Sequence, residues 1–324
     1  MDIVLVSILM ESEMKVTIKT PIFIGNDEEY YPQDYVLFED SICFVDRDKF
    51  IKKIKKEGLL EEFIKKSEDI DDLLDFIYDN VDDSVYTYCV DTEYEANERL
   101  YDSYSLPLKA FIKDKFLSKP IIPGSTIKGV IRTALLDYIV EKFGIKEKNI
   151  YKLEGEVFCN DKKDSKKDIL KALFVSDLKP INYKLKVIKP KNRPMKKRDN
   201  NIPIVLECLV DGEFEGEIRI DNNLLKNIKN RYFEKEPLNI ELIEKSIDRF
   251  FSVIHSKETK RFRANHPKYE KGFIKIGQHA GAGSKSLNSL RKVYIKQLRK
   301  EIDYQTSIWI DNEDNPLGWA KIEF

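Results

Sequence analysis

Residues 120–133 read Pro-Ile-Ile-Pro-Gly-Ser-Thr-Ile-Lys-Gly-Val-Ile-Arg-Thr, and this stretch decides the fold. Pro123 and Gly124 predict a rigid turn, and the hydroxyl residues that follow can cap a helix whose first backbone N–H groups are unpaired. Apolar residues then recur at helical spacing as far as Tyr138, so one face of this helix is expected to pack inward. The stretch therefore predicts a turn followed by a core helix over residues 126–142.

The start of this helix is also a candidate phosphate-binding surface. Lys128 and Arg132 are four residues apart, so they lie on one helix face beside the positive end of the helix dipole. The alternative is a capped core helix with two solvated charges. A nucleotide-triphosphate loop is excluded, because that motif places Lys and then Ser or Thr directly after its second glycine. The candidate ligand residues here are Gly124, Ser125, Thr126, Lys128 and Arg132.

A second candidate is the glycine-rich segment at residues 277–285, where the backbone can approach a phosphate closely. The order of its glycines, serines and lysine fits neither a dinucleotide fingerprint nor a triphosphate loop. Alone it is a plain turn, but together with residues 120–133 it favours a nucleic-acid site. A basic helix over residues 287–302 is expected either to extend this surface or to form its solvated side. The candidate RNA-binding residues are His279, Gly281, Gly283, Ser284 and Lys285.

Charge is segregated along the chain, and the basic pole lies at residues 184–198, which contain no acid. Prolines within and around this segment predict an extended, projecting loop rather than a helix. Such an arm neutralises phosphates with release of counterions. The alternative is a solvated loop. The candidate RNA-binding residues of the arm are Lys189, Lys191, Arg193, Lys196, Lys197 and Arg198.

The acidic pole lies at residues 68–102, where Arg99 is the single basic residue. Apolar residues at helical spacing make its first part a helical insertion that repels RNA and faces solvent or a protein partner. Asp82 and Asp83 have no framing His or glycine loop, so no metal site is expected there. Since the net charge of the chain is −1, any nucleic-acid site must be a local patch.

The order of predicted elements is β-α-β-β-α-β with long insertions, which is an α+β, RRM-like (ferredoxin-like) core. An RNP-like triplet of exposed aromatic residues is missing, so RNA binding is expected to depend on phosphates and shape. The strands are predicted at residues 14–20, 173–177 and 213–220, with a last strand at 273–276, 319–324 or both. The helices are predicted at residues 126–142 and 238–254, with a further helix at 47–66 in the first insertion.

Several of these segments resemble the RAMP superfamily of CRISPR–Cas systems, whose members bind RNA on RRM-like cores. The most specific match is Ile122–Gly129 with Arg132-Thr133. In their order, the segments are similar to one subunit of the type III-A Csm effector complex, from about residue 15 to the C-terminus. The other matching segments are Lys19–Gly25, Asp34-Tyr35-Val36, Phe44-Val45-Asp46, Leu173–Asp177, Ile276–Lys285 and Pro316–Ile322.

The resemblance implies a non-catalytic, guide-RNA (crRNA)-binding subunit that caps the 3′ side of the guide and supports maturation of its 3′ end in antiviral defence. The partners implied are the guide RNA, the backbone and small subunits of the complex, and host nucleases that trim the guide. One composite RAMP domain is expected over residues 1–324. It carries the helical acidic insertion at 47–110 and a basic, thumb-like arm at 181–205.

Two alternatives remain open. One is a RAMP endoribonuclease that processes precursor crRNA with His279 as general acid–base, because His279 is the histidine near a candidate RNA surface. The other is a phosphate-binding metabolic enzyme. Neither a cofactor nor a metal is expected.

The four cysteines form no C-x-x-C pair, so all are expected to be reduced, buried thiols in a cytoplasmic protein. The opening residues lack a basic region, so they are not expected to be a signal peptide. Since no apolar run reaches the ~18–20 residues that span a bilayer, no membrane segment is expected either. The cysteines are Cys43, Cys89, Cys159 and Cys208.

Overall fold

The computed structural model describes residues 9–93, 107–147, 149–162, 164–195, 204–288, 293–295, 300–302 and 305–324, and the chain folds as a mixed α+β protein. The strands are β1 (Leu9–Ile18), β2 (Gly25–Tyr30), β3 (Tyr35–Leu37), β4 (Ser41–Val45), β5 (Tyr86–Thr92), β6 (Leu108–Phe111), β7 (Leu173–Val175), β8 (Lys179–Ile188), β9 (Lys191–Pro194), β10 (Val205–Asp221), β11 (Phe273–Lys275), β12 (Val293–Ile295), β13 (Lys300–Ile302), β14 (Ser307–Ile310) and β15 (Trp319–Glu323).

The α-helices alternate with these strands along the chain. They are α1 (Arg47–Lys56), α2 (Leu60–Lys66), α3 (Ile70–Asn80), α4 (Gly124–Phe143), α5 (Ile150–Cys159), α6 (Asn222–Asn227) and α7 (Ile240–Arg261). Short 3-10 helices are η1 (Pro32–Asp34), η3 (Ile169–Ala172) and η4 (Ala282–Lys285). No helix in these described ranges is long and apolar enough to cross a membrane.

One large sheet organises the molecule, in the order β11-β15-β1-β10-β8-β5-β4-β3, and β6 and β7 also pair with β10. β1 lies antiparallel to both of its neighbours, β15 and β10. β10 in turn lies antiparallel to β7 and β8. The predicted strands are confirmed, and both candidates for the last strand form, because β11 and β15 pair with each other.

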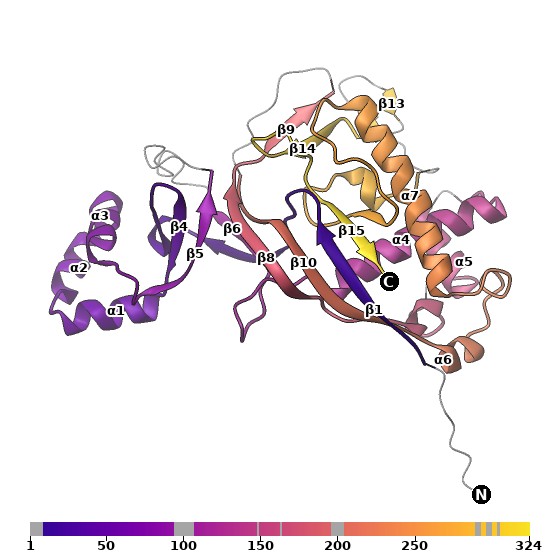
Figure 1. The fold of residues 1–324 in the computed structure, drawn as a ribbon, viewed down its shortest axis with the longest axis horizontal. Coiled ribbons are helices and arrows are strands. Elements are labelled where there is room, and N and C mark those ends of the chain that lie inside the picture. The colour runs from indigo at the N-terminus through magenta and orange to yellow at the C-terminus, as the bar shows by residue number, and fades with distance from the viewer. Residues whose placement is uncertain are drawn as a thin grey trace, which may run out of the picture.

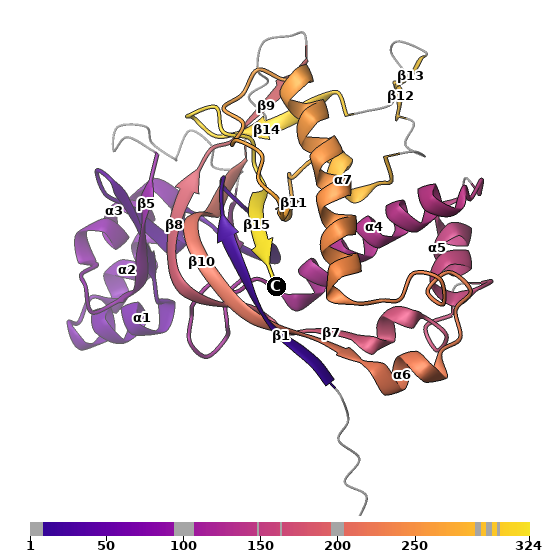
Figure 2. The same cartoon turned by 45° about the vertical axis from the view of Figure 1, so that its right-hand side comes forward.

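The two faces of this sheet differ because its strands alternate apolar and polar residues. On β1, Met14, Val16 and Ile18 are buried, and on β10 Phe214 and Ile218 are buried. The buried face is covered by α4 and α7, which pack against each other and share one hydrophobic core with these strands. Figures 1 and 2 show α4, α5 and α7 at one end of the molecule and α1–α3 at the other, with the sheet between them. The helices predicted at 126–142 and 238–254 are thus confirmed as α4 and α7.

The first insertion forms a small subdomain with a core of its own, to which Phe50, Ile54 and Phe76 contribute. The single helix predicted at 47–66 is wrong, because Gly58 has a φ of 78° and separates α1 from α2. The acidic segment begins as the helix α3, as expected, and then forms the strand β5. β5 joins the insertion to the main sheet by pairing with β4 and β8.

The projecting loop predicted at 184–198 is wrong for its described part, which lies in β8 and β9. β8 pairs with β10, and β9 pairs with β14. Pro180 and Pro194 lie near strand ends, where a missing N–H is tolerated, so the prolines do not prevent pairing. The helix predicted at 287–302 is also wrong in its described part, since β12 and β13 are strands that pair antiparallel there. Lys196, Lys197 and Arg198 lie outside the described residues.

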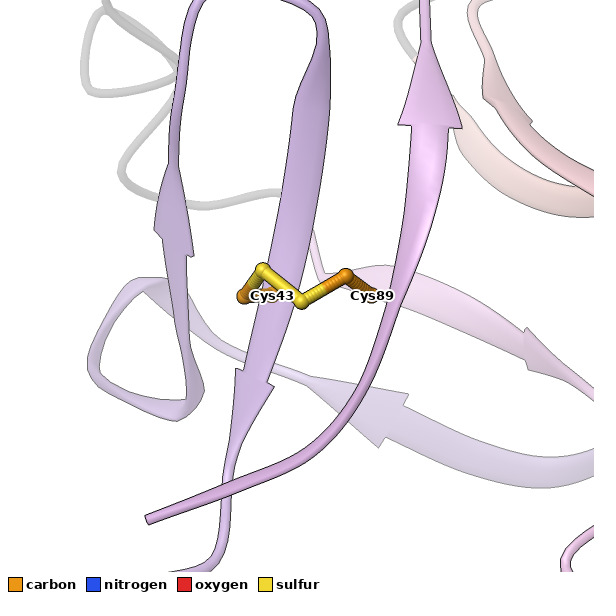
Figure 3. The surroundings of a disulfide bond; sticks show 2 residues. All are labelled: Cys43 and Cys89. Carbon is orange, nitrogen blue, oxygen red and sulfur yellow. A yellow bond between two sulfur atoms is a disulfide. The ribbon is translucent and has the colours of Figure 1, made fainter. Parts of the chain in front are cut away.

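Two of the four cysteines contradict the prediction of reduced thiols. Cys43 on β4 and Cys89 on β5 form a disulfide, which Figure 3 shows between the two strands. They are 46 residues apart in sequence, but the strand register places them opposite each other with their Cα atoms 4.0 Å apart. Cys159 and Cys208 are free and buried, as predicted.

Candidate nucleic-acid interface

The structure brings together two of the segments that the sequence singled out. The start of α4 and the glycine-rich segment line the two sides of an open groove of about 370 Å³. We call this space the α4 groove. Hydroxyl residues and one exposed lysine, Lys285, line it, which is a chemistry that suits a phosphate. The groove is lined by Ile24, Ser125, Thr126, Gly129, Val130, Thr133, Lys275, Ile276, Gly277, Gln278, Ser284 and Lys285.

The start of α4 is capped from outside the helix rather than by Ser125 or Thr126. No side chain of the N-cap residue Pro123 caps it, and Gly124 N donates instead to Asp177 Oδ1 at 2.8 Å. A Cβ atom on residue 124 would collide with the carbonyl oxygens of Val175 and Ser176. The glycine is therefore required because α4 begins directly against the end of β7.

Lys128 and Arg132 share a helix face, as predicted, but neither lines the α4 groove. Lys128 Nζ donates to the carbonyl oxygen of Leu173 at 2.6 Å, and burial lowers the pKa of Lys128. Arg132 donates to Asp168 at 2.7 Å, and its guanidinium lies 4.2 Å from the ring centre of Phe158. These contacts fasten α4 to the segment that precedes β7.

The glycine-rich segment is held by a buried polar relay. Gly283 N donates to Gln305 Oε1 at 3.0 Å, and Gln305 Nε2 donates to Glu258 Oε1 at 3.0 Å. Lys275 Nζ binds both oxygens of Glu258 at 2.6 and 2.7 Å. Gly281 has a φ of 89°, and a Cβ atom there would collide with Gln305. The relay fixes the loop that exposes Lys285, whereas Ser284 is buried and its hydroxyl donates to the Gly281 carbonyl at 2.8 Å. The sequence singled out Gly283 but not Gln305, Glu258 or Lys275.

His279 lies next to the α4 groove but does not line it. Its ring packs between Phe23 and Trp309, at centroid distances of 6.2 and 5.0 Å. Burial lowers the pKa of His279, and the charges of Lys109 and Lys285 lower it further. The ring is therefore neutral at neutral pH. The sequence did not identify Lys109 as a charge that acts on His279, because a single lysine in a short strand forms no recognisable motif.

The basic-arm residues are not brought to the α4 groove where the structure describes them. Arg193 donates to the carbonyl oxygen of Arg263 and to Asp314 Oδ1, at 2.7 and 2.8 Å. Lys189 and Lys191 flank the turn between β8 and β9. The arm and the groove are therefore separate basic features. Among the described side chains, no group of three His, Cys, Asp or Glu residues is placed to hold a metal ion.

The outer face of the main sheet is acidic. Glu13 lies directly opposite Glu217, and Lys15 lies opposite Glu215. These residues line a shallow groove of about 790 Å³ together with Asp177 and other residues. Phosphates would be repelled here, so the α4 groove is the better nucleic-acid surface.

Comparison with known proteins agrees with the resemblance. The Csm5 protein of the Methanocaldococcus jannaschii CRISPR system is 26% identical over 291 residues, which cover 82% of this chain and 66% of the relative. The Streptococcus thermophilus Csm5 protein is 29% identical over 183 residues, which cover 51% of this chain and 50% of the relative. The chain thus spans between half and two thirds of these curated relatives.

Two solved structures share the fold. A chain of a type III-A Csm–crRNA–target RNA ternary complex superposes with a TM-score of 0.74 at 20% identity and covers 96% of this chain and 100% of that chain. The crystal structure of T. onnurineus Csm5 gives a TM-score of 0.68 at 18% identity, with coverage of 95% and 99%. The RAMP superfamily model matches residues 15–308, and the chain therefore belongs to the RAMP superfamily.

Proposed function

We propose that this chain is a non-catalytic, guide-RNA-binding subunit of a type III-A Csm effector complex in CRISPR defence. The support is membership of the RAMP superfamily and similarity to Csm5 proteins over most of the chain. A structural neighbour, moreover, is a chain of a Csm–crRNA–target RNA complex.

The strand order supports an RRM-like core. β15, β1, β10 and β7 are neighbours in that order, and every adjacent pair is antiparallel. α4 connects β1 to β7 through the first half of the chain, and α7 lies between β10 and β15. This is the connectivity of a β-α-β-β-α-β core. In our proposal the whole chain is one composite domain with the acidic insertion at 47–110 and the basic arm at 181–205.

The α4 groove is the observation that carries RNA binding. Ser125 and Thr126 from α4 line the same groove as Ser284 and Lys285 from the glycine-rich segment. The groove offers hydroxyls and one positive charge but no exposed aromatic triplet, so binding depends on phosphate and shape. Lys196, Lys197 and Arg198 of the arm add further phosphate contacts in this proposal.

The proposed position of the subunit in the complex follows from the resemblance to this Csm subunit. The subunit caps the 3′ side of the guide, contacts the backbone and small subunits, and supports trimming of the guide 3′ end by host nucleases. The endoribonuclease alternative depends on His279, whose ring packs between two aromatic rings. A neutral imidazole that packs against aromatic rings gives that alternative no specific support, so we do not develop it.

RNA binding in the α4 groove is tested by the double variant Thr126→Ala/Lys285→Ala. Both side chains line the groove, so the variant should fold normally and bind single-stranded RNA more weakly. Loss of one cation should reduce the slope of log K against log[salt] by about one unit. Affinity and slope are measured by fluorescence anisotropy at several salt concentrations.

The matched control is Lys56→Ala, which removes the same charge from the exposed end of α1 in the acidic insertion. It should leave the affinity and the salt slope unchanged. A double variant with wild-type affinity and slope would show that the groove does not bind RNA.

A further inference from the structure

The loop between β6 and α4 displays the most exposed large apolar side chain in the part of the chain that the structure describes. Phe116 is 95% exposed, and its neighbour Leu117 is 64% exposed. The two side chains form one exposed apolar surface, and contiguous apolar surface is a mark of interaction sites. We call residues 114–119 the Phe116 tip.

The backbone of the tip is rigid. Asp114 Oδ1 accepts hydrogen bonds from Phe116 N at 2.9 Å and Leu117 N at 2.8 Å. These two bonds lower the pKa of Asp114. Asp114 N donates to the Lys119 carbonyl at 2.8 Å, and Ser118 N donates to the Asp114 carbonyl at 2.9 Å. These hydrogen bonds use backbone atoms and the Asp114 carboxylate, so the turn does not depend on the Phe116 ring. The ring is nevertheless exposed to water.

The base of the tip is fixed to the core. Lys113 Nζ binds the fully buried carboxylate of Glu207 on β10 and donates to the Tyr88 hydroxyl of β5 at 2.8 Å. Phe111 N donates to the same carboxylate at 2.9 Å. Phe116 is therefore presented from a preorganised loop, and an apolar anchor of this kind loses little entropy when a partner covers it.

The charges around the tip define the partner. Lys115 and Lys119 are exposed on either side of Phe116 and Leu117. The charge of Lys179 acts on Asp114, and Lys179 lines the acidic groove of the sheet with Glu215. A nucleic-acid strand that extended from the tip toward Lys179 would be repelled by this acidic groove, whereas a protein can place a few carboxylates opposite Lys115 and Lys119 alone.

We propose that the Phe116 tip is a docking anchor for a protein partner that offers an apolar pocket with carboxylates on its rim. Phe116 and Leu117 fill the pocket, and Lys115 and Lys119 meet its rim. The site is separate from the α4 groove, since none of these residues lines that groove. The inference rests on the proposed function in one respect: the partner is another protein subunit of the same complex.

The first test places a photo-crosslinking benzoylphenylalanine at residue 116. The full chain is assembled with the guide RNA and the other subunits of a type III-A Csm complex, and the crosslinked product is digested with RNase or with protease. The expected product resists RNase and maps by mass spectrometry to an apolar pocket flanked by Asp or Glu in another subunit. A product that RNase destroys, or no product, overturns the proposal.

The second test measures incorporation of Phe116→Ala into the same complex. Because the ring is exposed, the melting temperature should equal that of the wild type, while the apparent affinity for the other subunits should fall by about tenfold. The control is Ile64→Ala on α2, which removes a side chain that is 58% exposed and should change neither value. If Phe116→Ala and the wild type are incorporated equally, the proposal that the tip is a docking anchor is wrong.

A further variant separates the tip from the proposed function. Lys115→Glu/Lys119→Glu should weaken incorporation but leave binding of isolated single-stranded RNA unchanged, while Thr126→Ala/Lys285→Ala should retain the crosslink from residue 116. A wild-type chain that joins no Csm complex contradicts the proposed function and the tip together. If the wild type joins the complex and all tip variants join it equally well, only the docking proposal is contradicted.

Discussion

At the scale of residues, the joint between Gly124 and Asp177 sets the start of α4. The segment that matches the family most specifically contains Gly124, and a second matching segment ends in Ser176 and Asp177. The structure places them in direct contact, with Asp177 accepting the hydrogen bond of Gly124 N. The two segments are therefore two halves of one structural feature, which aims the first turn of α4 at the groove.

Replacement of this glycine should destabilise the protein. In Gly124→Ala the new Cβ atom meets two backbone carbonyls that cannot move aside, which should cost about 1–3 kcal/mol of the free energy of unfolding. Gly129→Ala is the control on the same helix, since its Cβ atom meets nothing within 4 Å and should stabilise α4 by up to about 1 kcal/mol. Urea denaturation measures both, and an equal effect of the two variants would contradict the close joint.

At the scale of elements, the acidic insertion is a subdomain with its own core and one covalent link. The disulfide between Cys43 and Cys89 connects β4 to β5, the strand that also pairs with β8 of the main sheet. Two ion pairs support that join, from Lys184 to Asp91 at 2.7 Å and from Lys186 to Glu93 at 3.6 Å. Two lysines of the basic pole at residues 184–198 thus pair with the acidic insertion.

Loss of the disulfide should loosen the insertion and leave the α4 groove intact. A link across 46 residues restricts the unfolded chain, so Cys43→Ser/Cys89→Ser should lower stability by about 2–4 kcal/mol under non-reducing conditions. Hydrogen exchange should increase in β4, β5 and α1–α3, and RNA affinity should stay at the wild-type value.

A control for this experiment is the wild-type protein in reducing buffer, which should behave like the double variant. If variant and oxidised wild type show the same exchange in the insertion, the bond does not contribute to its stability.

At the scale of the whole molecule, charge is divided among separate surfaces while the net charge is −1. The α4 groove carries Lys285, the outer face of the sheet carries glutamates, and the Phe116 tip carries apolar side chains between lysines. We expect each surface alone to support only weak binding, because each offers few charges. A chain of this kind gains affinity when a partner already holds the guide, because the second contact becomes intramolecular.

Assembly should therefore include one copy of the chain for each guide RNA, next to several copies of a backbone subunit. Reconstitution without the chain should still form the backbone filament, but the guide 3′ end should stay untrimmed or ragged. Native mass spectrometry gives the copy number and RNA sequencing gives the 3′ ends. Guides of unchanged 3′ length would contradict the maturation role, and many copies of the chain would contradict the terminal position.

The sequence by itself determined the helices and strands that follow from the pattern of apolar residues within one segment. Apolar spacing predicted α4 and α7, alternation predicted the strand through Phe214 and Ile218, and the family segments predicted the superfamily. Periodicity reports burial of one face, so it works wherever a single helix or strand packs on the core. The prediction of a projecting loop from prolines failed at residues 184–194, where the partners of the basic side chains come from β5 and from the loop after β14.

Only the tertiary structure decided the features that depend on residues far apart in sequence. The cap of α4 comes from Asp177, the glycine-rich loop is fixed by Glu258 through Gln305, and Cys43 meets Cys89 through strand register. Hydrogen bonds and disulfides act over a few ångströms, and separation in sequence does not report such distances. The α4 groove combines both kinds of information: the sequence determined its residue types, and the packing of α4 beside the glycine-rich loop decided that they form one site.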